Sequence, residues 1–270
     1  MTRPPAFRPA ALGELAIDDE GSFAHVGLYA DLKSVLVRAG YRFRVPREGV
    51  LSWDRAVLYN LVYWDADVPG GDVLVEPRVA ADVVCHAAWH HLAGAALATE
   101  GTRAAPEALL LGEAIASAFD LYLVGRLLGN APDAEFLATQ VPTMSDVAQA
   151  AGADEATFEA ILDSVASDPE AAFEDLRALL FDAALVLLPA ADADAAALAL
   201  APFDAHRFAP LLHHYELPSW LLSARARRAT AFDAASATRA RDADAALRAA
   251  PVSLDWLERS WVRPALGERG

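Results

Sequence analysis

Two histidines spaced four residues apart are the part of this sequence that most directly indicates chemistry. They are His86 and His90, in the segment VVCHAAWHHLAG. On an α-helix this spacing places both imidazoles on one face, about one turn apart. Two histidines so placed can share one tetrahedral zinc ion, which then needs a third protein ligand, commonly a carboxylate on a neighbouring helix. Glu113, in LLLGEAIASAFDLYLVG, is the carboxylate predicted to complete the site.

These two segments resemble the active-site core of the gluzincins, which are thermolysin-like zinc metallopeptidases. That family has HExxH on one helix and, about twenty residues later, a glutamate on the next helix followed by small and aromatic residues. The resemblance covers residues 79–127 and matches His86, His90 and Glu113 with the three zinc ligands of the family. It therefore implies zinc as a cofactor.

The sequence departs from the gluzincin pattern directly after the first histidine. The family has a glutamate there, which takes a proton from the attacking water, whereas the motif HAAWH places Ala87 at this position. Loss of a general base lowers the rate by about two to four orders of magnitude. The pattern predicts a degenerate zincin-like protein, a catalytically inactive peptidase homologue that still binds zinc through the three predicted ligands.

Two alternatives keep the helices but change the function. In the first, the protein is a metal-dependent hydrolase in which Asp82 or Asp120, rather than residue 87, activates water. In the second, it is a helical protein-binding scaffold without metal, and the histidines are packing residues. The scaffold would use the C-terminal helices, whose arginines otherwise form a solvated face beside neighbouring Asp and Glu. These arginines are Arg225, Arg227, Arg228, Arg239, Arg241 and Arg248.

A third alternative is a three-histidine metal site of the DinB type, in a helical bundle without strands. His86 and His90 would be joined there by His213 or His214, from the segment LLHHYELPSW. Adjacent histidines leave a helix in different directions, so at most one of the pair would serve. If this segment folds over the histidine helix, Tyr215 could also donate a hydrogen bond to a developing oxyanion.

Three further residues are predicted to lie around the ligands. Asp82 precedes His86 by one turn and Asp120 follows Glu113 by two, so each shares a face with a predicted ligand and could orient an imidazole. For Asp82 we favour a simpler role, a negative charge in the first turn of its helix. His91 points away from the shared face, and we expect it to be exposed or to lie outside the ligand set.

The composition predicts a mainly α fold, a multi-helix globular protein of one domain over 1–270. Of its 270 residues, 55% are hydrophobic and 22% are charged, and much of the apolar fraction is alanine, the best helix former. At most one short strand element, in PGGDVLVEPR, is expected before the histidine helix. A subdivision, if present, would fall near 129–142. The predicted helices are 26–40, 52–64, 79–97, 106–128, 133–139, 144–151, 154–167, 169–188, 191–200, 220–250 and 254–262.

The charge and the apolar pattern limit the partners. A formal net charge of −16 repels phosphate backbones and anionic lipid heads, so we expect no nucleic acid and no membrane partner and leave a protein partner open. The stretch 179–202 is broken by Asp and Pro and predicts two buried helices rather than a membrane span. One cysteine, Cys85, and a start without the apolar core of a signal peptide predict a cytoplasmic protein.

Overall fold

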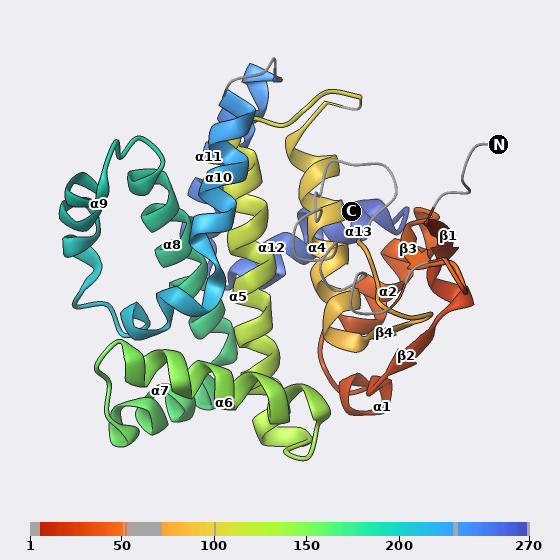
Figure 1. Ribbon diagram of the computed structural model, residues 1–270, viewed down its shortest axis with the longest axis horizontal. Helices are drawn as coiled ribbons and strands as arrows, with labels where there is room; N and C mark the ends of the chain where they lie inside the picture. The colour runs from red at the N-terminus through yellow and green to blue at the C-terminus, as the bar shows by residue number, and fades with distance from the viewer. Residues whose placement is uncertain (1–5, 51, 53–71, 100, 229–231, 269–270) are drawn as a thin grey trace.

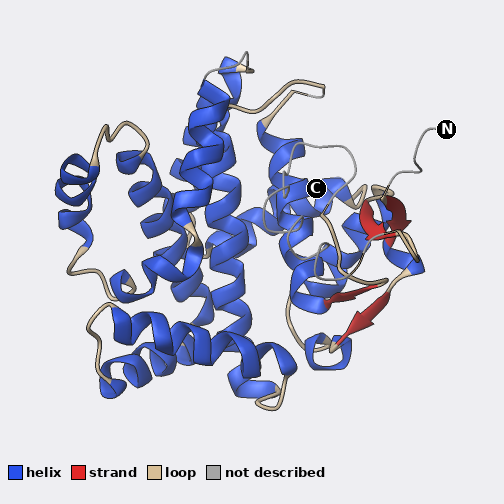
Figure 2. Ribbon diagram, viewed as in Figure 1, coloured by secondary structure: helices blue, strands red, loops and turns tan. Residues whose placement is uncertain are grey.

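The fold is mainly α-helical, as predicted, and its strands are confined to one side of the molecule (Figure 2). The structure is a computed structural model, and it describes residues 6–50, 52, 72–99, 101–228 and 232–268. The predicted helix 52–64 therefore lies outside the described residues, apart from residue 52. Residues on both sides of the possible boundary at 129–142 contribute to one hydrophobic cluster.

Helix α5 (Pro106–Asn130) runs through the middle of the molecule (Figure 1). It begins with proline, whose missing N–H costs nothing in the first turn of a helix. Most of its residues are buried, because α4 (Ala81–Leu97) packs on one side and α8 (Pro169–Leu187) on another. Gly125 permits the close approach to the end of α7 (Glu155–Ser167), since a Cβ there would lie 2.5 Å from the carbonyl oxygen of Val165.

Among the described helices, α5 is the one with the length and composition to cross a membrane. However, 89% of its most apolar stretch is buried inside the protein, which is the placement of a core helix.

The stretch 179–202, which the sequence predicts to form two buried helices, differs in part from that prediction. Its first part belongs to the buried helix α8, but the second helix, α9 (Ala193–Leu200), has no buried residue, and Leu198 is 77% exposed. The prediction of two buried helices was wrong for α9.

The other helices surround this central unit. Helix α2 packs on α4, while α7, α10 and α11 pack on α5. Their bounds are α2 Tyr29–Arg38, α7 Glu155–Ser167, α10 Leu217–Arg228 and α11 Ala234–Ala249. Shorter or peripheral helices are α1 Glu20–Phe23, α6 Glu135–Ala150, α12 Ser253–Leu257 and α13 Arg263–Ala265, with a π-helical turn η4 at Glu258–Val262 and 3₁₀ segments η1 Leu12–Glu14, η2 Ala201–Phe203 and η3 Ala209–Tyr215.

Two helix predictions were wrong in their boundaries. Residues 135–150 form one helix, α6, with Pro142 inside it, in place of the two predicted helices 133–139 and 144–151. Proline removes one helical hydrogen bond and usually ends a helix, which is why the sequence predicted a break. In place of the predicted helix 220–250, the described residues form α10, which ends at Arg228, and α11, which begins at Ala234. Asp233 caps the start of α11 by accepting a hydrogen bond from the Ala235 N–H at 3.0 Å.

Within the described part of the chain, four short strands pair in two small sheets, which is more than the single element predicted. Strand β1 (Phe7–Ala11) runs antiparallel to β3 (Arg42–Pro46), and β2 (Ala16–Asp18) runs parallel to β4 (Arg78–Ala80). The described part of PGGDVLVEPR contributes an isolated bridge at Val73 and the first residue of β4. Strand β4 ends where α4 begins, so the β2–β4 pair fixes the start of the histidine helix.

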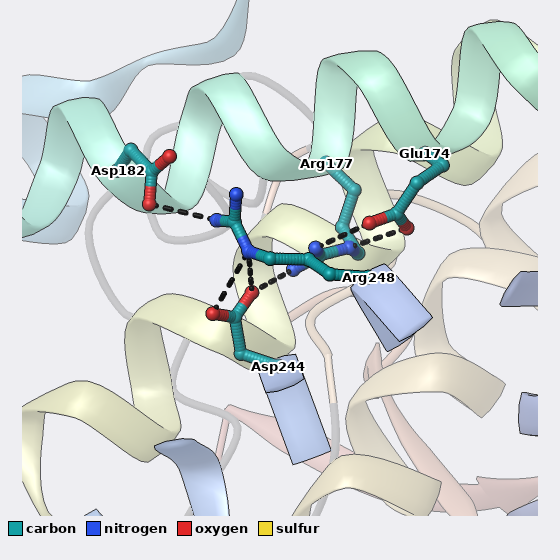
Figure 3. A network of polar contacts seen from close by, with 5 residues as sticks. All are labelled: Glu174, Arg177, Asp182, Asp244 and Arg248. Carbon is teal, nitrogen blue, oxygen red and sulfur yellow. Dashed lines mark hydrogen bonds and ion pairs between the residues drawn. The ribbon is translucent and has the colours of Figure 1, made fainter. Parts of the chain in front are cut away.

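The arginines near the C-terminus are largely bound to the protein's own acceptors. Figure 3 shows Arg177 of α8 and Arg248 of α11 sharing Asp244, with Glu174 and Asp182 completing the network. The side chain of Arg177 is fully buried.

Arg225, in α10, also binds acceptors of the protein itself. Its guanidinium donates to the carbonyl oxygens of residues 187, 188 and 190, where α8 ends. For Arg225 and Arg248, therefore, the charges complement neighbouring groups, as the simpler interpretation expects.

Candidate metal centre

The structure brings the three predicted ligands together between α4 and α5. One ligand atom from each of His86, His90 and Glu113 lies within 4.8 Å of the others. The two imidazole rings are 4.8 Å apart between centroids, and His90 Nε2 lies 3.6 Å from Glu113 Oε2. Within the described residues, this is the group of histidine and carboxylate side chains close enough together to hold a metal ion.

Small residues allow the two helices to approach closely at this point. Gly112 of α5 faces Ala93 of α4, and a Cβ on the glycine would lie only 3.2 Å from the Cβ of the alanine. On α4 the two histidines are separated by Ala87, Ala88 and Trp89, all of which are buried. Larger side chains at positions 93 and 112 would push the two helices apart, so these small residues bring Glu113 within reach of His90.

No protein-family model matches this chain, and neither does any curated protein or solved structure. The relation to the gluzincins thus stays an inference from the motif.

Asp120 orients the first histidine. Its Oδ2 accepts a hydrogen bond from His86 Nδ1 at 3.0 Å, which leaves Nε2 of the imidazole as the nitrogen able to bind a metal. Burial disfavours the charged imidazole, but the charge and hydrogen bond of Asp120, together with the charges of Glu113 and Asp72, raise the pKa of His86 to about 9. Burial and the charge of His86 lower the pKa of His90. Without a metal, His86 rather than His90 therefore carries the extra proton.

Replacing Asp120 with asparagine is expected to weaken zinc binding by about tenfold to a hundredfold, because the carboxylate that orients the imidazole loses its charge. Competition with a chromophoric zinc chelator measures the change. Asp146→Asn, at an exposed position on α6, is the matched control and should leave the affinity unchanged. Equal affinities for both variants would mean that Asp120 does not support the centre.

Asp82 lies in the first turn of α4, as predicted. Its side chain also borders a cleft that contains His86, Ala87 and Asp120. Burial and the neighbouring charge of Asp120 raise the pKa of Asp82 to about 6. The carboxylate thus has both a local role in its helix and a position beside the candidate centre.

The remaining predicted residues lie outside the ligand group. His91 is partly buried, with its ring edge-on to Tyr41 at 6.1 Å between centroids, and burial lowers its pKa. His213 is exposed, and His214 forms a hydrogen bond with Gln140, 3.1 Å from Nε2 to Oε1. Tyr215 is buried. The described residues do not assemble the alternative three-histidine site, and the strands also differ from that all-helical arrangement.

Two hollows flank the ligands, and the sequence predicted neither. A cleft of about 460 Å³ contains His86 and Ala87, whereas a cavity of about 30 Å³ is bordered by His90, Glu113 and Arg227. Arg227 is buried although it comes from α10, more than a hundred residues after Glu113. No periodicity links residues so far apart in the chain, so the sequence carried no signal for these surroundings.

Proposed function

We propose that this protein is a degenerate zincin-like protein that binds zinc through His86, His90 and Glu113 and lacks efficient peptidase activity. The observation that carries the proposal is the approach of the three ligand atoms to within 4.8 Å across two helices. Two imidazoles and one carboxylate are a ligand set that zinc favours. The hydrogen bond from His86 to Asp120 is the outer contact typical of zinc-binding histidines.

Each residue of the site has a separate role in this proposal. Bound zinc would act as a Lewis acid toward a carbonyl oxygen or water. His86 and His90 would hold the ion by ring nitrogens and Glu113 by a carboxylate oxygen, while Asp120 keeps the proton on Nδ1 of His86. Ala87, which borders the cleft, offers no group that can accept a proton. The arrangement supports binding without efficient hydrolysis.

One observation favours a second candidate, hydrolysis with a different general base. Asp82 borders the same cleft as Ala87, and its pKa of about 6 leaves the carboxylate mostly ionised at pH 7 and able to accept a proton. Zinc-dependent hydrolysis of a peptide or ester that is lost in Asp82→Asn would support this candidate. If the unaltered protein shows no hydrolysis, the result would support the first candidate, the inactive zinc-binding protein.

The metal content of the purified, untagged protein tests the proposal. After zinc is offered and the excess removed, elemental analysis should find about one zinc ion per chain, and almost none in His90→Ala or Glu113→Ala. His213→Ala, at an exposed histidine, is the control and should keep its zinc. Circular dichroism of each metal-free variant checks that the helices remain. Absence of zinc from the unaltered protein, or its retention in Glu113→Ala, would overturn the proposal.

A further inference from the structure

The turn between α4 and α5 is held by the residue that begins α11. That residue is Asp233, which lies 134 positions after Thr99 in the sequence. Its Oδ2 accepts hydrogen bonds from the backbone N–H and the hydroxyl of Thr99, at 3.2 and 2.8 Å, and also pairs with Arg239. Its backbone N–H donates to the carbonyl oxygen of Arg103 at 2.8 Å. Two distant parts of the chain are therefore tied together at this turn.

The start of α11 also binds the two helix ends that flank the turn. The guanidinium of Arg239 donates through Nε to the carbonyl oxygen of Leu97, the last residue of α4, at 2.8 Å. The hydroxyl of Ser236, which is buried, accepts a hydrogen bond from the N–H of Ala105, directly before α5, at 2.6 Å. Because one short segment holds both ends, it limits how far α5 can shift along α4. We call the contacts of Asp233, Ser236 and Arg239 the turn clamp.

The helix surfaces between the turn clamp and the metal ligands oppose such a shift only weakly. His90 precedes Leu97 by seven residues and Glu113 follows Ala105 by eight, so the ligands lie about two helical turns from the clamp. The cavity of about 30 Å³ extends along this stretch, and both helices contribute alanine and glycine to its walls. Small side chains form shallow ridges, which interlock less than large ones do. Packing alone thus leaves the register of the two helices poorly fixed here.

A metal site needs its ligands to be held to within about half an ångström. We propose that Asp233 is a positioning residue of the metal centre, because the turn clamp fixes the register of α4 against α5 and with it the distance between His90 and Glu113. The inference rests on the proposed function for the metal, whereas the register of the helices is a property of the metal-free protein as well. The hydrogen bonds from Thr99 and Arg239 lower the pKa of Asp233 to about 2, so its carboxylate is ionised at neutral pH.

The two oxygens of Asp233 have different partners, so one substitution can separate the turn clamp from the helix cap. Oδ1 accepts from the Ala235 N–H and caps α11, whereas Oδ2 accepts from Thr99 and Arg239. In Asp233→Asn the amide oxygen can keep the cap, since asparagine caps a helix about as well as aspartate does. Its NH₂ group, however, would face donors in place of the acceptor Oδ2. The variant should therefore lose the clamp and keep the helix.

Zinc affinity and hydrogen–deuterium exchange of the metal-free protein test the proposal together. Asp233→Asn should bind zinc about threefold to tenfold more weakly in competition with a chromophoric chelator. Amides in residues 90–113 should exchange faster in the metal-free variant, while those of the buried helix α8 keep their rates, because a general loss of stability would speed both. Asp192→Asn makes the same replacement at the cap of α9, where Oδ1 accepts from the Ala195 N–H at 2.8 Å, and should change neither quantity.

Two results would overturn the inference: a zinc affinity that Asp233→Asn leaves unchanged, or unchanged exchange in residues 90–113. Thr99→Val, which removes one hydroxyl donor of the turn clamp, should shift both quantities in the same direction by a smaller amount, and Thr99→Ser should behave as the unaltered protein does. If the unaltered protein takes up no zinc, the proposed metal centre is rejected and the exchange decides the clamp by itself. Faster exchange confined to 90–113 would then support the clamp, and unchanged exchange would reject it.

Discussion

Ala87→Glu is expected to raise zinc-dependent peptide hydrolysis by about two to four orders of magnitude, the effect of supplying a general base. Residue 87 follows His86 directly and borders the cleft, so a glutamate there would extend into open space of about 460 Å³ beside the candidate centre. Hydrolysis of a fluorogenic peptide, measured with and without a chelator, gives the rate.

Two variants control this experiment. Ala87→Gln has nearly the same size as the glutamate variant but cannot accept a proton, and it should stay as slow as the unaltered protein. Combining Ala87→Glu with Glu113→Ala should abolish the gain, because the third zinc ligand is removed. If Ala87→Glu folds, binds zinc and remains inactive, residue 87 is not what limits catalysis, and the gluzincin interpretation of the site is wrong.

Arg177→Ala is expected to lower the free energy of unfolding by about 3–5 kcal/mol, the usual cost of breaking a buried ion pair. The guanidinium is fully buried and donates to Glu174 Oε1 at 2.6 Å and Asp244 Oδ1 at 2.8 Å, as Figure 3 shows. Alanine would leave a cavity and deprive both carboxylates of a partner. Urea denaturation followed by circular dichroism measures the change.

Arg248 offers a matched comparison, since it binds the same Asp244 from a position that is 38% exposed. Its replacement by alanine should cost about 1 kcal/mol or less, as exposed ion pairs generally do. Arg177→Met separates packing from charge, because it fills much of the cavity while removing the ion pair. Similar losses for Arg177→Ala and Arg248→Ala would show that burial does not strengthen this network.

The candidate site was predictable because its residues are close in sequence and follow the period of a helix. Spacing alone placed His86 and His90 on one face, and it placed Asp120 two turns from Glu113 on α5, where the structure has it hydrogen-bonded to His86. Helices α4, α5, α7 and α8 were predicted to within a few residues for the same reason. The zinc ion and the inactive-peptidase interpretation stay predictions, since ligand spacing indicates neither the metal nor the reaction.

What the sequence did not predict depends on contacts between distant segments. Strands β1 and β2 are short, and their partners lie tens of residues away, so no local alternation marks them. The exposure of α9 was missed because its alanines and leucines look the same whether or not another element covers them. Helix α6 continues through Pro142 although proline favours a break, so the local preference of this residue did not predict the helix.

The β2–β4 pair and the α4–α5 hairpin differ in the loop that each must close during folding. His90 and Glu113 are 23 positions apart, whereas Ala16 pairs with Arg78 across 62 positions. Contacts between nearby residues form faster than contacts between distant ones, because less chain entropy is lost. The three ligands should therefore meet early, on a hairpin that is still unanchored, and the cleft wall supplied by β2 should follow later. When the whole chain refolds, assembly of the three ligand side chains would thus precede completion of the cleft beside them.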